Sequence, residues 1–183
     1  ISPYNLLKLQ HPKIRAKLLF FVKKILYSYA DMVVANSHAG IEEIKQLKVR
    51  YAAACDNNYE PDAIAELFTK DAIWDGGMMG YAKTQSGIRE FFSNASSLVG
   101  FSVHGLSNPL IDIDGDKATG QWYLYQPMVM KETDKGFWFY AQYQDEYIRT
   151  SKGWKFQHVK VVAKAFTPYE KGFGKLLMAD LPT

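Results

Sequence analysis

An aspartate and a histidine about fifty residues apart are the two side chains best suited to acid–base chemistry in this chain. Asp56 closes the helix-like segment Arg50-Tyr-Ala-Ala-Ala-Cys-Asp, and His104 precedes a series of aromatic-rich segments. In such a pair the carboxylate fixes the imidazole tautomer and stabilises the imidazolium, while the imidazole takes a proton. Tyr51, on the same predicted helix, could donate a hydrogen bond to a developing oxyanion. Together these residues indicate proton abstraction from carbon.

Each of these side chains also has a structural interpretation. Asp56 begins the run Asp-Asn-Asn, whose side chains bond nearby backbone amides in turns. His104 could be a core histidine with satisfied ring nitrogens, and Tyr51 could be a core residue. The catalytic interpretation therefore depends on whether the fold brings Asp56 and His104 together.

Apolar residues repeat with helical spacing in the first half of the chain. Pro12 suits the first turn of a helix, and the spacing predicts helices over 12–29, 39–56 and 87–98, with another that begins at Pro61. Between the first two lies the run Asp31-Met-Val-Val-Ala-Asn36, which we interpret as a short strand, followed by Ser37 as a helix cap. A further short strand is expected at 72–74.

From Gly100 the pattern changes to a period of two, which is typical of strands. The predicted strands lie at 101–104, 110–113, 118–130, 137–149 and 154–166. Helices followed by an antiparallel meander predict an α+β domain, with helices on one face of a curved sheet. The one predicted boundary lies near residue 36, with a helical extension at 1–36 and the main domain at 37–183.

Composition and charge exclude several classes of protein. The net charge is +3, and residues 1–40 hold six basic residues against one acidic, so the main domain does not have the charge of a nucleic-acid binder. The pair Lys23-Lys24 interrupts the longest apolar run, which argues against stable membrane insertion. The single cysteine, Cys55, fits a reducing compartment, and we expect a cytoplasmic protein. No Cys/His cluster and no phosphate-binding glycine loop is present, so neither a metal nor a cofactor is expected.

The order of several short segments resembles the SnoaL-like branch of the nuclear-transport-factor-2-like (NTF2-like) superfamily. The segments that carry the resemblance are 44–51, 71–74, His104, 114–122, 144–155 and 168–172. This superfamily includes scytalone dehydratase, bile acid 7α-dehydratase, hexachlorocyclohexane dehydrochlorinase and ketosteroid isomerase. The resemblance implies a cone-shaped α+β barrel, in which a curved antiparallel sheet wraps around a long helix and an apolar pocket opens in the mouth. It also implies catalytic roles for Asp56, His104 and Tyr51, and a supporting role for Arg149.

The resemblance is incomplete at other catalytic positions. The segment Gln126-Pro127-Met128 lacks the second histidine of scytalone dehydratase, so no single activity of the family transfers whole. We therefore expect a cofactor-independent lyase or isomerase, similar to a dehydratase, that acts on a small hydrophobic cyclic substrate. The alternatives are a non-catalytic ligand-binding or assembly domain, and the β subunit of a ring-hydroxylating oxygenase.

The high aromatic content, 15% of residues, could supply both core and pocket. Besides Arg149, which could instead form a surface ion pair, the candidate pocket or supporting residues are Trp74, Trp122, Tyr125, Met128 and Tyr143. The surplus of aromatics also predicts a homodimer or higher homo-oligomer. Residues 1–40 faintly resemble a glycosyltransferase fragment, too short to carry that enzyme's activity.

Overall fold

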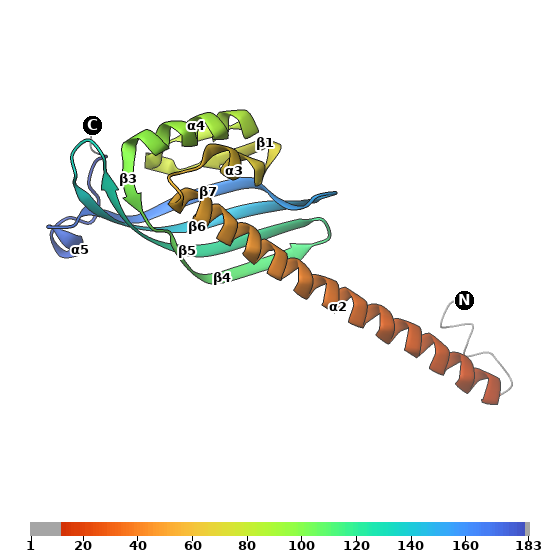
Figure 1. Ribbon diagram of the computed structural model, residues 1–183. Coiled ribbons are helices and arrows are strands. Elements are labelled where there is room, and N and C mark those ends of the chain that lie inside the picture. The colour runs from red at the N-terminus through yellow and green to blue at the C-terminus, as the bar shows by residue number, and fades with distance from the viewer. Residues whose placement is uncertain (1–11, 182–183) are drawn as a thin grey trace. The chain divides into compact units, whose positions relative to one another are not determined.

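The computed structural model describes residues 12–181, with helix α2 (Pro12–Asp56) as its first element (Figure 1). The chain divides into two units, Ile1–Gly40 and Ile41–Thr183. The backbone is helical throughout 12–56, so the predicted strand at 31–36 and the separate helix start after Ser37 are wrong. The apolar residues at 32–35 fit a strand and a helix segment equally well, because so short a run does not establish a period.

The second unit alternates short helices with a sheet. After α2 come the following elements, in chain order: α3 (Pro61–Glu66), β1 (Phe68–Asp75), the 3-10 helix η1 (Gly77–Met79), β2 (Tyr81–Lys83), α4 (Thr84–Leu98), β3 (Val99–Ser102), β4 (Gly105–Asp114), β5 (Lys117–Met130), β6 (Gly136–Thr150), β7 (Gly153–Pro168) and α5 (Gly172–Lys175). The predicted helices at 61 and 87–98 correspond to α3 and α4. The long predicted strands correspond to β5, β6 and β7.

The seven strands form one curved sheet that does not close into a complete barrel (Figure 1). The strand order is β2-β1-β7-β6-β5-β3, and β4 also pairs with β5. All pairs are antiparallel except β1 with β7, which is parallel. The α+β class with a curved sheet around a long helix is confirmed, and the purely antiparallel pairing is corrected at this one pair.

The last four turns of α2 belong to the second unit and fill the hollow of the sheet. Ile44, Leu47, Tyr51 and Cys55 lie on one stripe of the helix, and each is at most 2% exposed. The ring of Tyr51 packs edge-on against aromatic rings from β1, α4, β6 and β7. This packing fixes the position at which α2 ends, and Asp56 is its last residue.

A proline breaks the edge of the sheet at the position of the candidate histidine. Strand β3 pairs with β5 as far as Ser102, and β4 resumes the pairing at Gly105. Between them the Pro127 carbonyl accepts a hydrogen bond from the Val103 N–H at 3.2 Å, but Pro127 has no N–H with which to continue the ladder. His104 therefore lies in a two-residue break, so the predicted strand over 101–104 is wrong at this residue. Its backbone amide is free to bond elsewhere.

Candidate active site

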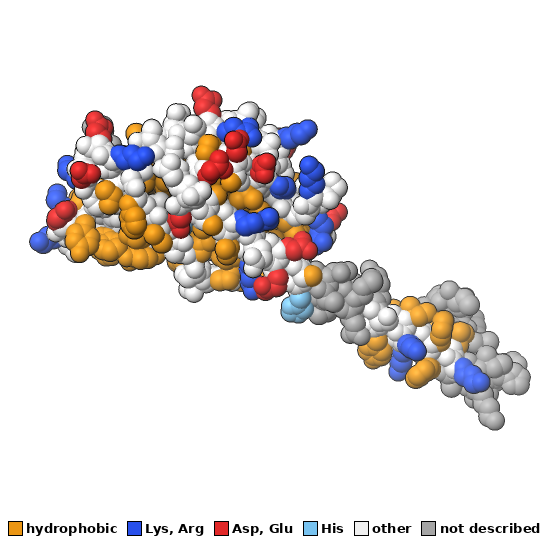
Figure 2. Space-filling model, in the orientation of Figure 1, with side chains coloured by type: hydrophobic (Ala, Val, Ile, Leu, Met, Phe, Trp, Pro, Cys, Tyr) orange, Lys and Arg blue, Asp and Glu red, His pale blue; other side chains and the backbone are white. Residues whose placement is uncertain are grey.

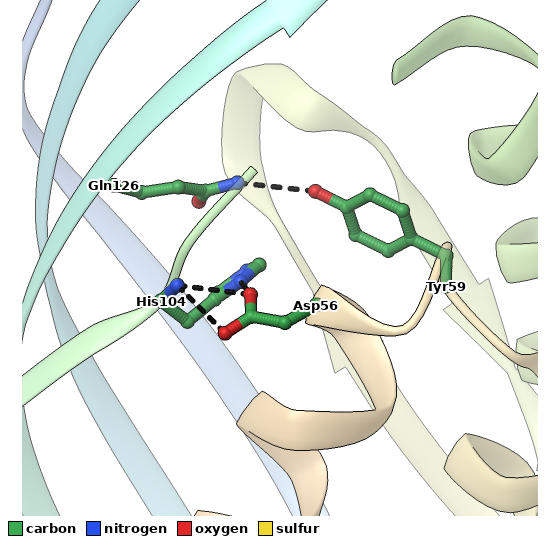
Figure 3. A network of polar contacts seen from close by, with 4 residues as sticks. All are labelled: Asp56, Tyr59, His104 and Gln126. Carbon is green, nitrogen blue, oxygen red and sulfur yellow. Dashed lines mark hydrogen bonds and ion pairs between the residues drawn. The ribbon is translucent and has the colours of Figure 1, made fainter. Parts of the chain in front are cut away.

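The side chain of Asp56 binds His104 through both its backbone and its ring (Figure 3). Asp56 Oδ1 lies 2.7 Å from His104 Nδ1, and the His104 backbone N–H donates to the two carboxylate oxygens at 2.9 and 3.2 Å. A carboxylate at this distance holds the proton on Nδ1. The nitrogen left to accept a proton is therefore Nε2.

The two members of this pair differ in their exposure to water. The His104 side chain is 4% exposed and lines a cavity, whereas the Asp56 side chain is 32% exposed. The carboxylate thus keeps part of its hydration, and the imidazole is enclosed beside the apolar space. This arrangement can take a proton from a ligand in the cavity and stabilise the resulting imidazolium.

The cavity occupies the mouth of the curved sheet and has a volume of about 370 Å³. That volume lies within the usual range of small-molecule sites. Most of its lining is apolar, with Phe91, Phe92, Leu124, Met128 and Phe139 among the lining residues. The few polar side chains on its wall are therefore the groups able to orient a ligand.

Two tyrosines from facing elements reach this cavity, Tyr51 from α2 and Tyr143 from β6. The Tyr51 hydroxyl accepts a hydrogen bond from Trp74 Nε1 at 2.9 Å. Burial raises the pKa of both tyrosine hydroxyls well above the ordinary value, and hydrogen bonding from Tyr51 partly offsets the rise for Tyr143. Both hydroxyls thus stay protonated and can act as hydrogen-bond donors but not as bases.

A second polar pair on the cavity wall was missed by the sequence analysis. Gln126 Nε2 donates to the Tyr59 hydroxyl at 3.1 Å, and both side chains line the cavity (Figure 3). Gln126 shares the inward face of β5 with Met128, so the period of two could have placed it in the pocket. Tyr59 lies in the turn after Asp56, where no periodicity indicates which way a side chain points.

Below the cavity a lysine and an aspartate form a fully buried ion pair. Lys48 Nζ lies 2.8 Å from Asp145 Oδ2, and neither side chain is exposed. Lys48 Nζ also lies 3.2 Å from the centroid of the Tyr143 ring, and Asp145 accepts a hydrogen bond from the Tyr147 hydroxyl at 2.8 Å. Burial lowers the pKa of Lys48 and raises that of Asp145, although each partner's charge opposes the shift.

Three of the predicted pocket or supporting residues lie away from the cavity. Trp122 faces inward but is buried nearer the other end of β5, where its Nε1 donates to the Tyr147 hydroxyl at 3.1 Å. Tyr125 is on the opposite face of the same strand and is 38% exposed. Arg149 is near the far end of β6, 3.8 Å from an Asp116 carboxylate oxygen and 4.7 Å from the Trp154 ring. The alternation of a strand gives the face of a residue but not its depth along the sheet.

The other candidates, Tyr51, Trp74, His104, Met128 and Tyr143, line the cavity, and Asp56 contacts it through His104. Among the described residues, no group of three His, Cys, Asp or Glu side chains comes together as metal ligands would. No helix within 12–181 is long and apolar enough to cross a membrane.

The chain belongs to the SnoaL-like domain family, which matches residues 37–160. An uncharacterised protein of Mycobacterium tuberculosis is 32% identical over 123 residues, which cover 62% of this chain and 78% of that protein. The family membership confirms the resemblance to the SnoaL-like branch for the short segments between 44 and 155.

Three solved structures have a similar fold. A protein from Novosphingobium aromaticivorans, provisionally named an aromatic ring hydroxylase, has a TM-score of 0.64 and 29% identity over 68% of this chain and 90% of that one. A provisional scytalone dehydratase from the same organism has a TM-score of 0.69 and 18% identity, over 74% and 91%. A hexachlorocyclohexane dehydrochlorinase has a TM-score of 0.66 and 21% identity, over 84% and 97%. Lyases thus occur among proteins of this fold.

Proposed function

We propose that this protein is a cofactor-independent lyase or isomerase, similar to a dehydratase, that acts on a small hydrophobic cyclic substrate. The observation that carries the proposal is the 2.7 Å contact between Asp56 and a His104 ring that lines an apolar cavity. An aspartate-bound imidazole is a competent base, and the cavity offers a cyclic molecule an apolar site beside it.

In the proposed elimination, His104 Nε2 takes a proton from a carbon next to a carbonyl group. The electrons of the C–H bond form a new C=C bond to the next ring carbon, which carries the hydroxyl. The C–O bond between that carbon and the hydroxyl breaks. The proton held by His104 passes to the departing hydroxyl, which leaves as water. Asp56 stabilises the imidazolium between the two transfers. In an isomerisation the same proton would return to a different carbon.

Tyr143 is the proposed donor to the substrate oxygen on which negative charge develops. The Tyr51 hydroxyl already accepts from Trp74, and the Tyr51 ring packs edge-on against the Tyr143 ring, with the centroids 6.2 Å apart. A protonated hydroxyl in a closed, apolar site stabilises a developing oxyanion more than the same group in water does. Tyr51 is therefore proposed to position Tyr143 rather than to contact the reacting atoms.

The test is a screen of cyclic β-hydroxy ketones for loss of water, followed by mass spectrometry. We expect turnover of at least one compound, and a loss of about 10²–10⁴-fold when His104 is changed to Gln. His158→Gln is the matched control, because His158 lies next to Glu146 on the sheet and does not line the cavity. Full turnover in His104→Gln would exclude the mechanism.

The alternative of a non-catalytic binding domain predicts a different result from the same variants. Ligands would bind in the cavity, but the wild-type protein would turn over none of the compounds. Variants of Asp56 or His104 would then have no reaction rate to change. The Asp56–His104 contact favours an enzyme over a binding domain, because binding an apolar ligand does not require a base beside the cavity. A cytoplasmic location remains our expectation.

We also propose a homodimer that forms through an exposed aromatic cluster on the outer face of the sheet. Tyr125 stacks with Trp138, Tyr140 packs on Tyr125, and Phe173 of α5 packs on Tyr140. Figure 2 shows hydrophobic side chains gathered over α5 and the adjoining strands. We expect a dimer by light scattering at micromolar concentration and a monomer for Tyr140→Lys; a monomeric wild type would exclude the proposal.

A further inference from the structure

The turn that follows Asp56 holds a bulky residue in a conformation that L side chains rarely adopt. Asn58 and Tyr59 both have φ of 54°, in the left-handed region. Asparagine tolerates that region, but an aromatic residue there is an outlier. Strain of this kind persists only where surrounding contacts over-determine it, and it is concentrated at functional sites.

The contacts of the Tyr59 ring explain why the strained conformation is retained. The ring stacks on Phe92 with centroids 6.1 Å apart, and its edge-to-face contact with the His104 ring has a centroid distance of 6.0 Å. Its hydroxyl accepts from Gln126 at 3.1 Å. The left-handed turn therefore places the Tyr59 ring against the His104 ring and the Tyr59 hydroxyl within hydrogen-bonding distance of the Gln126 amide.

Gln126 brings a neutral polar group to the same place. It is 5% exposed, and it lines the apolar cavity. Tyr59 occupies one end of its amide, and the other end makes no hydrogen bond with a described residue. An amide oxygen that a bound ligand covers is costly without a partner, so a ligand that supplies a donor gains affinity over a ligand that does not.

We propose that the Tyr59–Gln126 pair binds a hydroxyl group on the substrate ring, which donates a hydrogen bond to the free amide oxygen of Gln126. The substrate class is therefore an oxygenated cyclic molecule and not a halogenated hydrocarbon, which has no group for the free end of the amide. A neutral amide neither takes nor gives a proton at ordinary pH, so Gln126 is a positioning and specificity residue. The inference rests on the proposed function, since it concerns the ligand of the same cavity.

Calorimetric titration with 2-naphthol and naphthalene tests the inference in the full-length chain. The two probes share one ring system and differ by a single hydroxyl. We expect 2-naphthol to bind at least about 10-fold more tightly than naphthalene. In Gln126→Met, which keeps the side-chain length, this preference should disappear because 2-naphthol loses affinity while naphthalene does not.

Two further variants exclude a general loss of structure. Gln142→Met is the matched control: Gln142 bonds to Gln121 on the outer face of the sheet, and the probe preference should be unchanged. Tyr59→Phe keeps the ring contacts with Phe92 and His104 but frees the amide, and should change the affinity for 2-naphthol alone. Equal affinities for the two probes in wild type, equal losses of both in Gln126→Met, or binding of neither probe would overturn the inference.

Binding of the probes is separable from the proposed chemistry. The titrations are repeated in His104→Gln, where the preference for 2-naphthol should persist. If the preference persists but no cyclic β-hydroxy ketone is turned over, the proposed function fails and oxygen recognition stands. If turnover depends on His104 but Gln126→Met leaves the preference intact, only the recognition inference fails.

Discussion

The buried Lys48–Asp145 pair below the cavity gives a prediction whose size can be worked from the structure. At 2.8 Å and an effective dielectric constant of about 20, the attraction between the two charges is about 6 kcal/mol. Burial of each ion costs several kcal/mol. The pKa of Lys48 is lowered and that of Asp145 is raised, with burial as the largest cause of both shifts. Desolvation of the two ions together therefore offsets most or all of the attraction between them.

Removal of one partner should then be much worse than removal of both charges. Lys48→Met leaves a buried carboxylate without its cation and should lower the free energy of unfolding by about 3–5 kcal/mol. Asp145→Asn removes that charge but keeps an oxygen that accepts the hydrogen bond of Tyr147. We expect the double variant to recover about 2–4 kcal/mol of the loss, because an uncompensated charge no longer remains.

The assay is urea unfolding of wild type, both single variants and the double variant, followed by tryptophan fluorescence. The double variant should be more stable than Lys48→Met alone. If the two single losses simply added, the pair would not be coupled, and the reasoning from its burial and distance would be refuted. If Lys48→Met alone were as stable as wild type, the side chain could not be buried as the structure places it.

Two further predictions concern stability and the pocket. Gly120→Val should cost about 1–3 kcal/mol in thermal unfolding, because a Cβ there would lie 2.9 Å from the Tyr147 ring; an unchanged Tm would contradict it. Tyr143→Phe should lower kcat for a confirmed substrate by about 10²-fold with KM little changed; an effect on KM alone would remove Tyr143 as the oxyanion donor.

The outline of the sheet could be predicted from the sequence because long strands establish their own period. The predicted strands 118–130, 137–149 and 154–166 differ by at most two residues at each end from β5, β6 and β7. The run 31–36 gave the wrong element for the opposite reason, since it is too short to distinguish a strand from a helix segment.

The candidate site was predictable only in part. The resemblance to the SnoaL-like family indicated that Asp56 and His104 would meet, and they lie 2.7 Å apart. The break that releases His104 depends on Pro127 in a neighbouring strand, which local patterns do not reveal. Tyr59 reaches the cavity only because of its left-handed backbone. Such features depend on contacts between distant segments, so no single-sequence pattern records them.

The outer and inner positions of the aromatic residues show the same limit. Trp122 and Tyr125 lie three residues apart on β5 and therefore face opposite sides of the sheet. Period two could have excluded Tyr125 from the pocket once the face of Gln126 was known. It could not have shown that Trp122 is buried below the cavity rather than on its wall.

The central claim is that Asp56 and His104 abstract a proton from carbon, and exchange of a carbon-bound proton tests it most directly. The measurement follows loss of the C2 proton signal of 1-tetralone in D₂O by NMR, with wild type, His104→Gln and the control His158→Gln. The account predicts exchange above the buffer rate for wild type and His158→Gln, and a loss of about 10²–10⁴-fold in His104→Gln. Exchange at the same rate in wild type and His104→Gln would contradict it, as would a wild-type rate equal to that of buffer alone.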